Sequence, residues 1–180
     1  MRVIAGKFKG RQLIGPKDQS FRPTLDRVKE SIFNVLGQDL VDSLVLDLFC
    51  GTGALGIEAI SRGAMRATFV DNTKSILDIA RRNTTALGID PKSKYVQADV
   101  FEFLEHSRNF KCNIVFADPP YDKKYGSAIC QSLIECNILQ PRGIIVLERF
   151  KKETLEYTEL QLAKTLKFGQ TEVDFFIREV

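Results

Sequence analysis

The sequence has no tryptophan, a single histidine (His106) and no two cysteines in a Cys-x-x-Cys spacing. Zinc sites and Ser-His or Cys-His nucleophiles need histidines or cysteines in close groups. The scarcity of histidine and the spacing of the cysteines therefore argue against both. We therefore expect no metal ion. We also expect free thiols in the core at the four cysteines, which are Cys50, Cys112, Cys130 and Cys136.

Long apolar runs are also missing. No stretch approaches the roughly 20 residues of a membrane-spanning helix, and the first residues do not resemble a signal peptide. With 44% hydrophobic and 27% charged residues, the 180-residue chain has the composition of a soluble globular domain. We expect a cytoplasmic monomer with no membrane contact.

Positive charge is concentrated at one end of the chain. The total net charge is +3, but residues 1–29 alone hold +6, so the remainder holds −3. Phe8 and Phe21 lie among these charges, a mixture typical of nucleic-acid contacts. A basic end on a slightly acidic body predicts a polyanionic partner, the alternative being a solvated, charged hairpin. The basic side chains are Arg2, Lys7, Lys9, Arg11, Lys17, Arg22, Arg27 and Lys29.

From residue 43 onwards, short apolar runs alternate with segments of helical period, which is typical of an α/β fold with a parallel sheet. Ahead of this pattern, a helix is expected from Thr24 to Gly37, with Lys29 off its apolar stripe. A turn is expected at residues 141–143. Strands are expected at residues 2–5, 11–14, 44–48, 67–70, 94–98, 113–117, 144–147, 161–167 and 172–177. The first two would form a β-hairpin with a basic tip, and the last two an antiparallel pair.

The tetrad Asp118-Pro119-Pro120-Tyr121 follows directly on the apolar run at residues 113–117. Two prolines cannot continue a sheet ladder, so the chain must leave the sheet there, at the end where open α/β sheets bind ligands. Asp118 and the Pro119 carbonyl can each accept one N–H from the amine of a planar base, while Tyr121 stacks on its ring. The alternative is a surface turn stiffened by proline.

A glycine loop, Gly51-x-Gly53-x-x-Gly56, follows the run at residues 44–48, and Asp71 lies twenty positions beyond Gly51. This spacing satisfies the dinucleotide-binding fingerprint, in which glycines let the backbone approach a ligand and the acidic residue binds a ribose. NAD and S-adenosylmethionine both carry an adenosine ribose. The fingerprint alone therefore leaves both ligands open.

Two further carboxylates favour S-adenosylmethionine over NAD. Asp47 lies four residues before Gly51, where it would repel a pyrophosphate but attract the ammonium group of a methionine moiety. Asp99 closes the strand expected at residues 94–98 and can accept from an adenine amino group. The chain length also leaves little room for a separate dehydrogenase catalytic domain.

The glycine loop and the tetrad, together with several other segments in their order along the chain, resemble the 16S ribosomal RNA guanine-N2 methyltransferases. These enzymes modify guanine 966 of the bacterial small subunit. The resemblance extends over essentially the whole chain. It rests on Arg22-Pro23-Thr24, Asp26-Arg27-Val28, Phe33-Asn34, residues 47–56, Glu58-Ala59, Ser61-Arg62-Gly63-Ala64 and the tetrad. The chain departs from the family at Asp71, where glutamate is common, which leaves the geometry of the ribose contact open.

The resemblance implies a Rossmann-like S-adenosylmethionine-dependent methyltransferase fold with a seven-stranded, mainly parallel sheet whose last strand is antiparallel. S-adenosylmethionine would be the donor, and the acceptor would be ribosomal RNA, either naked or within the assembled small ribosomal subunit. Residues 1–22 would form a basic, RNA-contacting appendage and residues 23–180 the methyltransferase domain. Arg22 would serve either the RNA or the donor pocket.

Residues and resemblance together predict three groups of functional side chains. The catalytic group that holds the guanine is Asp118, Pro119, Pro120 and Tyr121. The donor-binding group is Asp47, Gly51, Gly53, Asp71 and Asp99. The RNA-binding group is Lys7, Lys9, Arg11 and Arg22.

Three other functions remain open at this point. A methyltransferase of DNA adenine-N6 or of a protein amide would share the tetrad, and an NAD-dependent oxidoreductase would share the glycine loop. A catalytically silent RNA-binding module would have no need of four carboxylates at strand ends.

Overall fold

The computed structural model describes residues 1–15, 26–120 and 123–179, and we call residues 1–15 the N-terminal arm. The helices are α1 (Asp26–Leu36), α2 (Ala54–Ser61), α3 (Lys74–Leu87), α4 (Val100–His106) and α5 (Gly126–Glu135), with short 3-10 helices η1 (Gly37–Leu40) and η2 (Asp90–Lys92). The strands are β1 (Leu44–Leu48), β2 (Arg66–Asp71), β3 (Ser93–Gln97), β4 (Cys112–Ala117), β5 (Leu139–Phe150), β6 (Leu160–Phe168) and β7 (Thr171–Arg178).

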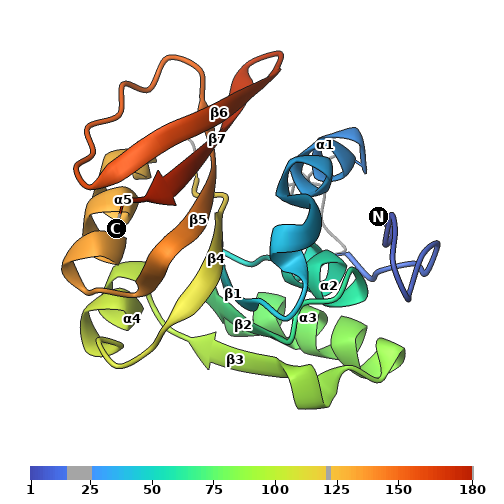
Figure 1. The fold of residues 1–180 in the computed structure, drawn as a ribbon. Helices are drawn as coiled ribbons and strands as arrows, with labels where there is room; N and C mark the ends of the chain where they lie inside the picture. The colour runs from blue at the N-terminus through green and yellow to red at the C-terminus, as the bar shows by residue number, and fades with distance from the viewer. Residues whose placement is uncertain (16–25, 121–122, 180) are drawn as a thin grey trace.

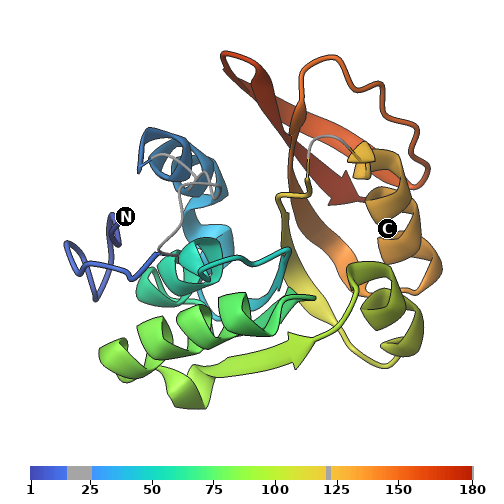
Figure 2. The same ribbon diagram turned by 180° about the vertical axis from the view of Figure 1, so that it is seen from behind.

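These strands form one seven-stranded sheet in the order β3-β2-β1-β4-β5-β7-β6 (Figures 1 and 2). The first five strands in this order are parallel, whereas β7 is antiparallel to both β5 and β6. The predicted α/β class and the antiparallel end of the sheet are confirmed. The carboxyl ends of the parallel strands meet along one edge of the sheet, which we call the carboxyl edge.

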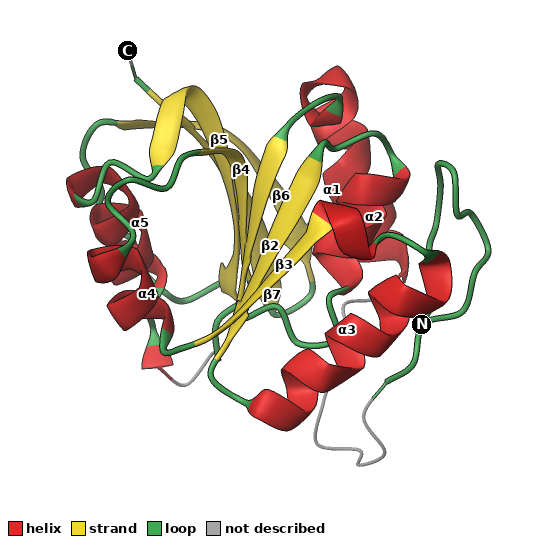
Figure 3. Ribbon diagram, turned by 90° about the horizontal axis from the view of Figure 1, so that it is seen from below, coloured by secondary structure: helices red, strands yellow, loops and turns green. Residues whose placement is uncertain are grey.

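Helices cover both faces of the sheet (Figure 3). One buried apolar cluster joins α1, α2 and α3 to the face that carries Phe69 and Phe116, and the other joins α4 and α5 to the face that carries Leu46 and Val115. Successive strand residues point to opposite faces of the sheet, and helices cover both faces, so the residues pointing to either face must be apolar. This double coverage explains why the central strands read as nearly continuous apolar runs.

The chain changes its direction of travel across the sheet between β1 and β4. From β1 it proceeds to β2 and β3 on one side, and then returns to place β4 on the other side of β1. The crevice outside the strand ends at such a switch point is where open α/β sheets bind ligands. Helix α1 covers this region, since Phe33 contacts Phe116 of β4 with ring centroids 5.4 Å apart. The short connection from α1 through η1 to β1 means that α1 begins at the carboxyl edge.

Two local predictions are wrong in extent. Strand β5 begins at Leu139, and the turn expected at residues 141–143 is an irregularity inside the strand, where Arg142 has φ 61° and the register with β4 shifts. The N-terminal arm forms a single antiparallel bridge between Arg2 and Gln12 in place of two strands. Thr24, the predicted N-cap of α1, lies outside the described residues. Within the described ranges, no helix is both long enough and apolar enough to cross a bilayer.

Candidate active site

Asp47 is a buried carboxylate at the switch point, with 2% of its surface exposed. Its Oδ2 accepts the backbone N–H of Gly56 in the glycine loop at 2.9 Å. Burial raises the pKa of Asp47 well above its usual range, and the nearby carboxylates of Asp118 and Asp71 raise it further, while the Gly56 N–H lowers it. Three carboxylates therefore interact at the carboxyl edge, on both sides of the switch point.

Asp71 ends β2 and holds the glycine loop in place. Its Oδ2 accepts the N–H of Gly51 at 3.1 Å, and its Oδ1 accepts the N–H of Thr73 at the start of α3 at 2.9 Å. Gly51 and Gly53 have φ values of 55° and 78°, in the left-handed region that favours glycine. Each carboxylate oxygen has a second lone pair, so these bonds leave Asp71 able to accept from ribose hydroxyls.

Asp118 follows the last residue of β4 and is half-buried. Pro119 is buried, and Pro120 is exposed and accepts the N–H of Lys123 at 3.1 Å through its carbonyl. The predicted proximity of Asp118 to the donor side of the site agrees with its electrostatic effect on Asp47. Tyr121 lies outside the described residues, so its stacking role stays a prediction.

Asp99 is exposed and acts as the N-cap of α4. Its Oδ1 accepts the N–H groups of Phe101 at 2.8 Å and Glu102 at 3.3 Å, which satisfies two otherwise unpaired helix donors. The predicted contact with an adenine amino group is untested. The capping role was missed, although an aspartate directly before a helix is a typical cap.

A group of three aromatic rings that was not predicted from the sequence lies beside Asp99. The ring of Tyr125 stacks on Phe49, with centroids 6.3 Å apart, and meets Phe101 edge-on at 5.1 Å. These rings come from the loop after β1, the first turn of α4 and the residue before α5. They join the segments that carry Asp99 and the tetrad into one packed unit, in a geometry that aromatic pairs prefer.

Cys50 lies in the glycine loop but is chemically inert. Burial raises its pKa well above the usual range, and burial also raises the pKa values of Cys112 and Cys130 to about 12. A thiol that stays protonated is a poor nucleophile. The four cysteines are buried free thiols, as predicted.

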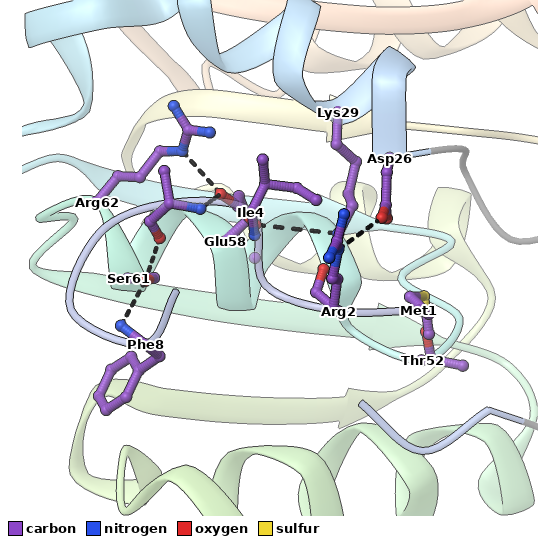
Figure 4. Close-up of polar contacts among 12 residues, drawn as sticks. Met1, Arg2, Ile4, Phe8, Asp26, Lys29, Thr52, Glu58, Ser61 and Arg62 are labelled. Atoms are coloured by element: carbon purple, nitrogen blue, oxygen red, sulfur yellow. Dashed lines mark hydrogen bonds and ion pairs between the residues drawn. The ribbon is translucent and has the colours of Figure 1, made fainter. Parts of the chain in front are cut away.

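The N-terminal arm is docked on α2 by two side chains (Figure 4). Glu58 is fully buried and accepts the N–H groups of Ile4 at 2.7 Å and Ala5 at 2.9 Å. Ser61 accepts the N–H of Phe8 at 3.0 Å and donates its hydroxyl to the Ala5 carbonyl at 2.6 Å. Backbone N–H groups that leave water need partners. Helix α2 thus supplies the hydrogen bonds that a neighbouring strand would otherwise supply.

Lys29 was predicted to lie off the apolar stripe of α1, and this prediction is wrong. Its side chain is fully buried, donates to the Arg2 carbonyl at 2.5 Å and lies 3.9 Å from Glu58 (Figure 4). Glu58 also pairs with Arg62 at 2.8 Å. Burial lowers the pKa of Lys29, and Glu58 opposes that effect. Lys29 therefore fixes the arm and is not part of the exposed basic surface.

Asn83 of α3 joins the arm to the glycine loop. It is 2% exposed; its Oδ1 accepts the N–H of Ile14 at 2.7 Å, and its Nδ2 donates to the carbonyls of Ile14 and Thr52, both at 3.0 Å. The Thr52 hydroxyl also donates to the sulfur of Met1 at 3.5 Å. This junction was not predicted, because a lone asparagine in a helix gives no sign of its distant partners.

The predicted RNA-binding side chains of the arm are exposed. These are Lys7, Lys9 and Arg11. Lys7 lies over the ring of Phe8 at 5.5 Å from its centroid, and Arg11 donates to the Ala86 carbonyl of α3 at 3.4 Å. Arg22 lies outside the described residues.

Comparison with protein families establishes the kinship of the chain. A family model described as "Conserved hypothetical protein 95" matches residues 1–177. The chain belongs to this family.

Several relatives of this chain have names that describe methyltransferases. The Bacillus subtilis (strain 168) protein "Putative rRNA methyltransferase YlbH" is 35% identical over 180 residues, which cover 98% of each chain. The Haemophilus influenzae protein "Ribosomal RNA small subunit methyltransferase D" is 34% identical over 157 residues, 86% of this chain and 81% of the relative. A solved structure, "Putative methyltransferase yhhF from Escherichia coli", is 31% identical with a TM-score of 0.89 and covers 100% of this chain and 98% of its own. The predicted kinship and the predicted fold are confirmed.

Proposed function

We propose that this chain transfers a methyl group from S-adenosylmethionine to the exocyclic N2 amine of one guanine in 16S ribosomal RNA. The observation that carries the proposal is the grouping of Asp47, Asp71 and Asp118 around the switch point, beside the glycine loop. The names of relatives at 34% and 35% identity support ribosomal RNA as the acceptor. The choice of guanine N2 rests on the family resemblance and on the chemistry of the tetrad.

The donor-site residues fit S-adenosylmethionine better than NAD. S-adenosylmethionine carries a sulfonium and an ammonium group, whereas NAD carries the two negative charges of a pyrophosphate. Burial raises the pKa of Asp47, and the neighbouring carboxylates raise it further. A cation among these carboxylates relieves their repulsion, and an anion increases it. Asp71 would bind the ribose and Asp99 the adenine amine, while Gly51 and Gly53 allow close backbone approach.

The tetrad would position the acceptor amine. The bound donor supplies an activated methyl group on a positively charged sulfur, so the protein acts mainly by positioning and electrostatics. Hydrogen bonds from the guanine amine to Asp118 and to the Pro119 carbonyl localise the nitrogen lone pair and direct it at the methyl carbon. As the N–C bond forms, the C–S bond breaks and its electron pair stays on sulfur. The surplus amine proton passes to Asp118 or to water.

The target guanine must be unpaired or flipped out, because a paired base cannot reach the end of β4. Unstacking costs a few kcal/mol, and stacking of about 1–3 kcal/mol per base on Tyr121 would offset part of that cost. Lys7, Lys9 and Arg11 would bind phosphates, which gives affinity without sequence information. In this proposal residues 1–22 are the RNA-contacting appendage of a methyltransferase domain at residues 23–180.

Mass mapping of methylated nucleotides tests the proposal. RNA from cells with and without this protein is digested and compared, and N2-methylguanosine at one 16S position should depend on the protein. Restoring the parent gene should restore the modification, whereas a gene with Asp118→Ala should not. Identical maps in all strains would contradict the proposal. A dependent modification in DNA adenine or in a protein amide would assign the site to another amine methyltransferase class.

A further inference from the structure

The end of β5 projects beyond the acceptor side of the site. Leu147 of β5 pairs with Ala117 at the end of β4, and β5 continues to Phe150. At about 3.3 Å per residue, these three further residues extend roughly 10 Å past the end of β4. Lys151 follows, and its N–H donates to the Gln170 carbonyl at 3.0 Å, which ties this turn to the turn between β6 and β7.

A half-buried arginine, Arg149, holds this projection in place. Arg149 bonds Asp174 on β7 at 2.6 Å and Glu172 at 2.8 Å, and it donates to the Glu153 carbonyl at 3.0 Å. The Glu153 side chain in turn accepts the N–H of Gly126, the first residue of α5, at 2.8 Å. The projection is thus fastened both to β7 and to the helix that follows the tetrad.

Three lysines on this projection, Lys151, Lys152 and Lys167, form what we call the lysine rim. Lys151 and Lys152 are exposed, and the Lys167 side chain is 78% exposed. Lys167 lies 4.0 Å from Glu172, but Glu172 is already paired at 2.8 Å with Arg149. The lysine rim therefore presents exposed ammonium groups to solvent at the carboxyl edge.

The turn between β6 and β7, to which Lys151 is bonded, and the N-terminal arm lie on opposite sides of α1 (Figures 1 and 2). Helix α1 begins at the carboxyl edge, and its first turn carries the exposed Arg27. Basic segments therefore flank α1 on both sides, and the lysine rim lies at the same edge of the sheet as Asp118.

We propose that the lysine rim is a second RNA-docking surface, which binds phosphates on the opposite side of the target nucleotide from the arm. This inference rests on the proposed RNA methylation. A base leaves its stack at an energetic cost. Holding the backbone on both sides of the nucleotide keeps the base extruded, and lysine–phosphate contacts provide that hold without reading sequence.

Salt-dependent binding of an unmodified transcript of 16S ribosomal RNA tests the lysine rim. The test variant carries Lys151→Gln and Lys152→Gln. The matched control carries Lys92→Gln and Lys94→Gln. These two exposed lysines lie at the end of η2 and in β3, the strand at the opposite side of the sheet from β6. For single-stranded contacts, the slope of log affinity against log salt should become shallower by about 0.7 per lost contact, and the pair should lose roughly 25-fold in affinity at 0.1 M salt.

The control should keep the parent slope, and both variants should keep the parent affinity for S-adenosylmethionine, which shows that they fold. Equal slopes for the test variant and the parent would overturn the lysine rim, as would an equal change in the control. Because binding is read without turnover, the two proposals fail separately. A parent protein that binds the transcript through the rim but methylates no RNA would refute the proposed function and leave the docking surface standing.

Discussion

Replacing Asp47 by asparagine should change stability and donor binding in opposite directions. Asparagine keeps an oxygen that can accept the Gly56 N–H, but it removes a buried charge. Because burial raises the folded-state pKa of Asp47, the folded protein holds this proton more tightly than the unfolded chain. That contribution to stability is complete below the unfolded pKa of about 3.9. It is lost as pH rises through the folded pKa.

Each pH unit between the two pKa values removes about 1.4 kcal/mol from the stability of the parent, and the Asp47→Asn variant escapes this loss. Urea unfolding at a series of pH values should therefore show the stability of the variant relative to the parent rising with pH and then levelling off. Asp99→Asn makes the same chemical change at an exposed site and controls for the loss of one negative charge.

Calorimetry on the same variant measures the expected loss of S-adenosylmethionine affinity. Losing a charged partner worth about 1.5–3 kcal/mol should weaken S-adenosylmethionine binding roughly 10- to 150-fold. Donor affinity of the parent should rise with pH through the same window, since the ionised carboxylate is the form that attracts a cation. If the stabilities of the parent and the Asp47→Asn variant changed with pH in parallel, or if donor affinity were unchanged in the variant, the assignment of Asp47 as the donor's charged partner would be refuted.

Four further substitutions, one of them a matched control, separate the parts of the site. Asp118→Ala should lower the turnover rate by about 10²–10³-fold with donor affinity nearly intact, and lost donor affinity in calorimetry would count against its role. Asp71→Ala should weaken donor binding first, and an unchanged dissociation constant would contradict that role. Gly6→Ala should lift the arm from α2 and reduce RNA affinity in a filter-binding assay, because its Cβ would lie 2.0 Å from the Ser61 carbonyl oxygen. Gly10→Ala has a similar φ but meets no atom within 4 Å, so it should bind RNA as the parent does.

The central strands and the glycine loop could be predicted because their signals are local. A strand covered on both faces reads as an apolar run, and the runs at residues 44–48 and 113–117 correspond to β1 and β4. The grouping of carboxylates also followed, since residues at the ends of parallel strands meet at one edge. The irregularity in β5 escaped prediction, because Pro141 and Gly143 signal a turn locally while the chain rejoins the same strand.

The polar contacts that fix the arm could not be predicted. Lys29 and Glu58 are 29 positions apart, and each alone looks like an ordinary solvent-facing residue of a helix. They become buried only when α1 and α2 pack against the same part of the arm, where each has a backbone partner. Asn83 is a similar case, since its partners Ile14 and Thr52 lie on two segments far from it in sequence. Pairings of this kind depend on tertiary packing, which periodicity does not encode.

Transfer of an isotopically labelled methyl group by the purified protein tests the central claim most directly. Unmodified 16S ribosomal RNA is incubated with labelled S-adenosylmethionine, digested to nucleosides and resolved by mass spectrometry. Label is expected in N2-methylguanosine alone, at about one residue per RNA molecule, and it should accumulate about 10²–10³-fold more slowly with the Asp118→Ala protein. Label in another nucleoside, or none in any nucleoside from an intact and donor-binding parent protein, would contradict the central claim.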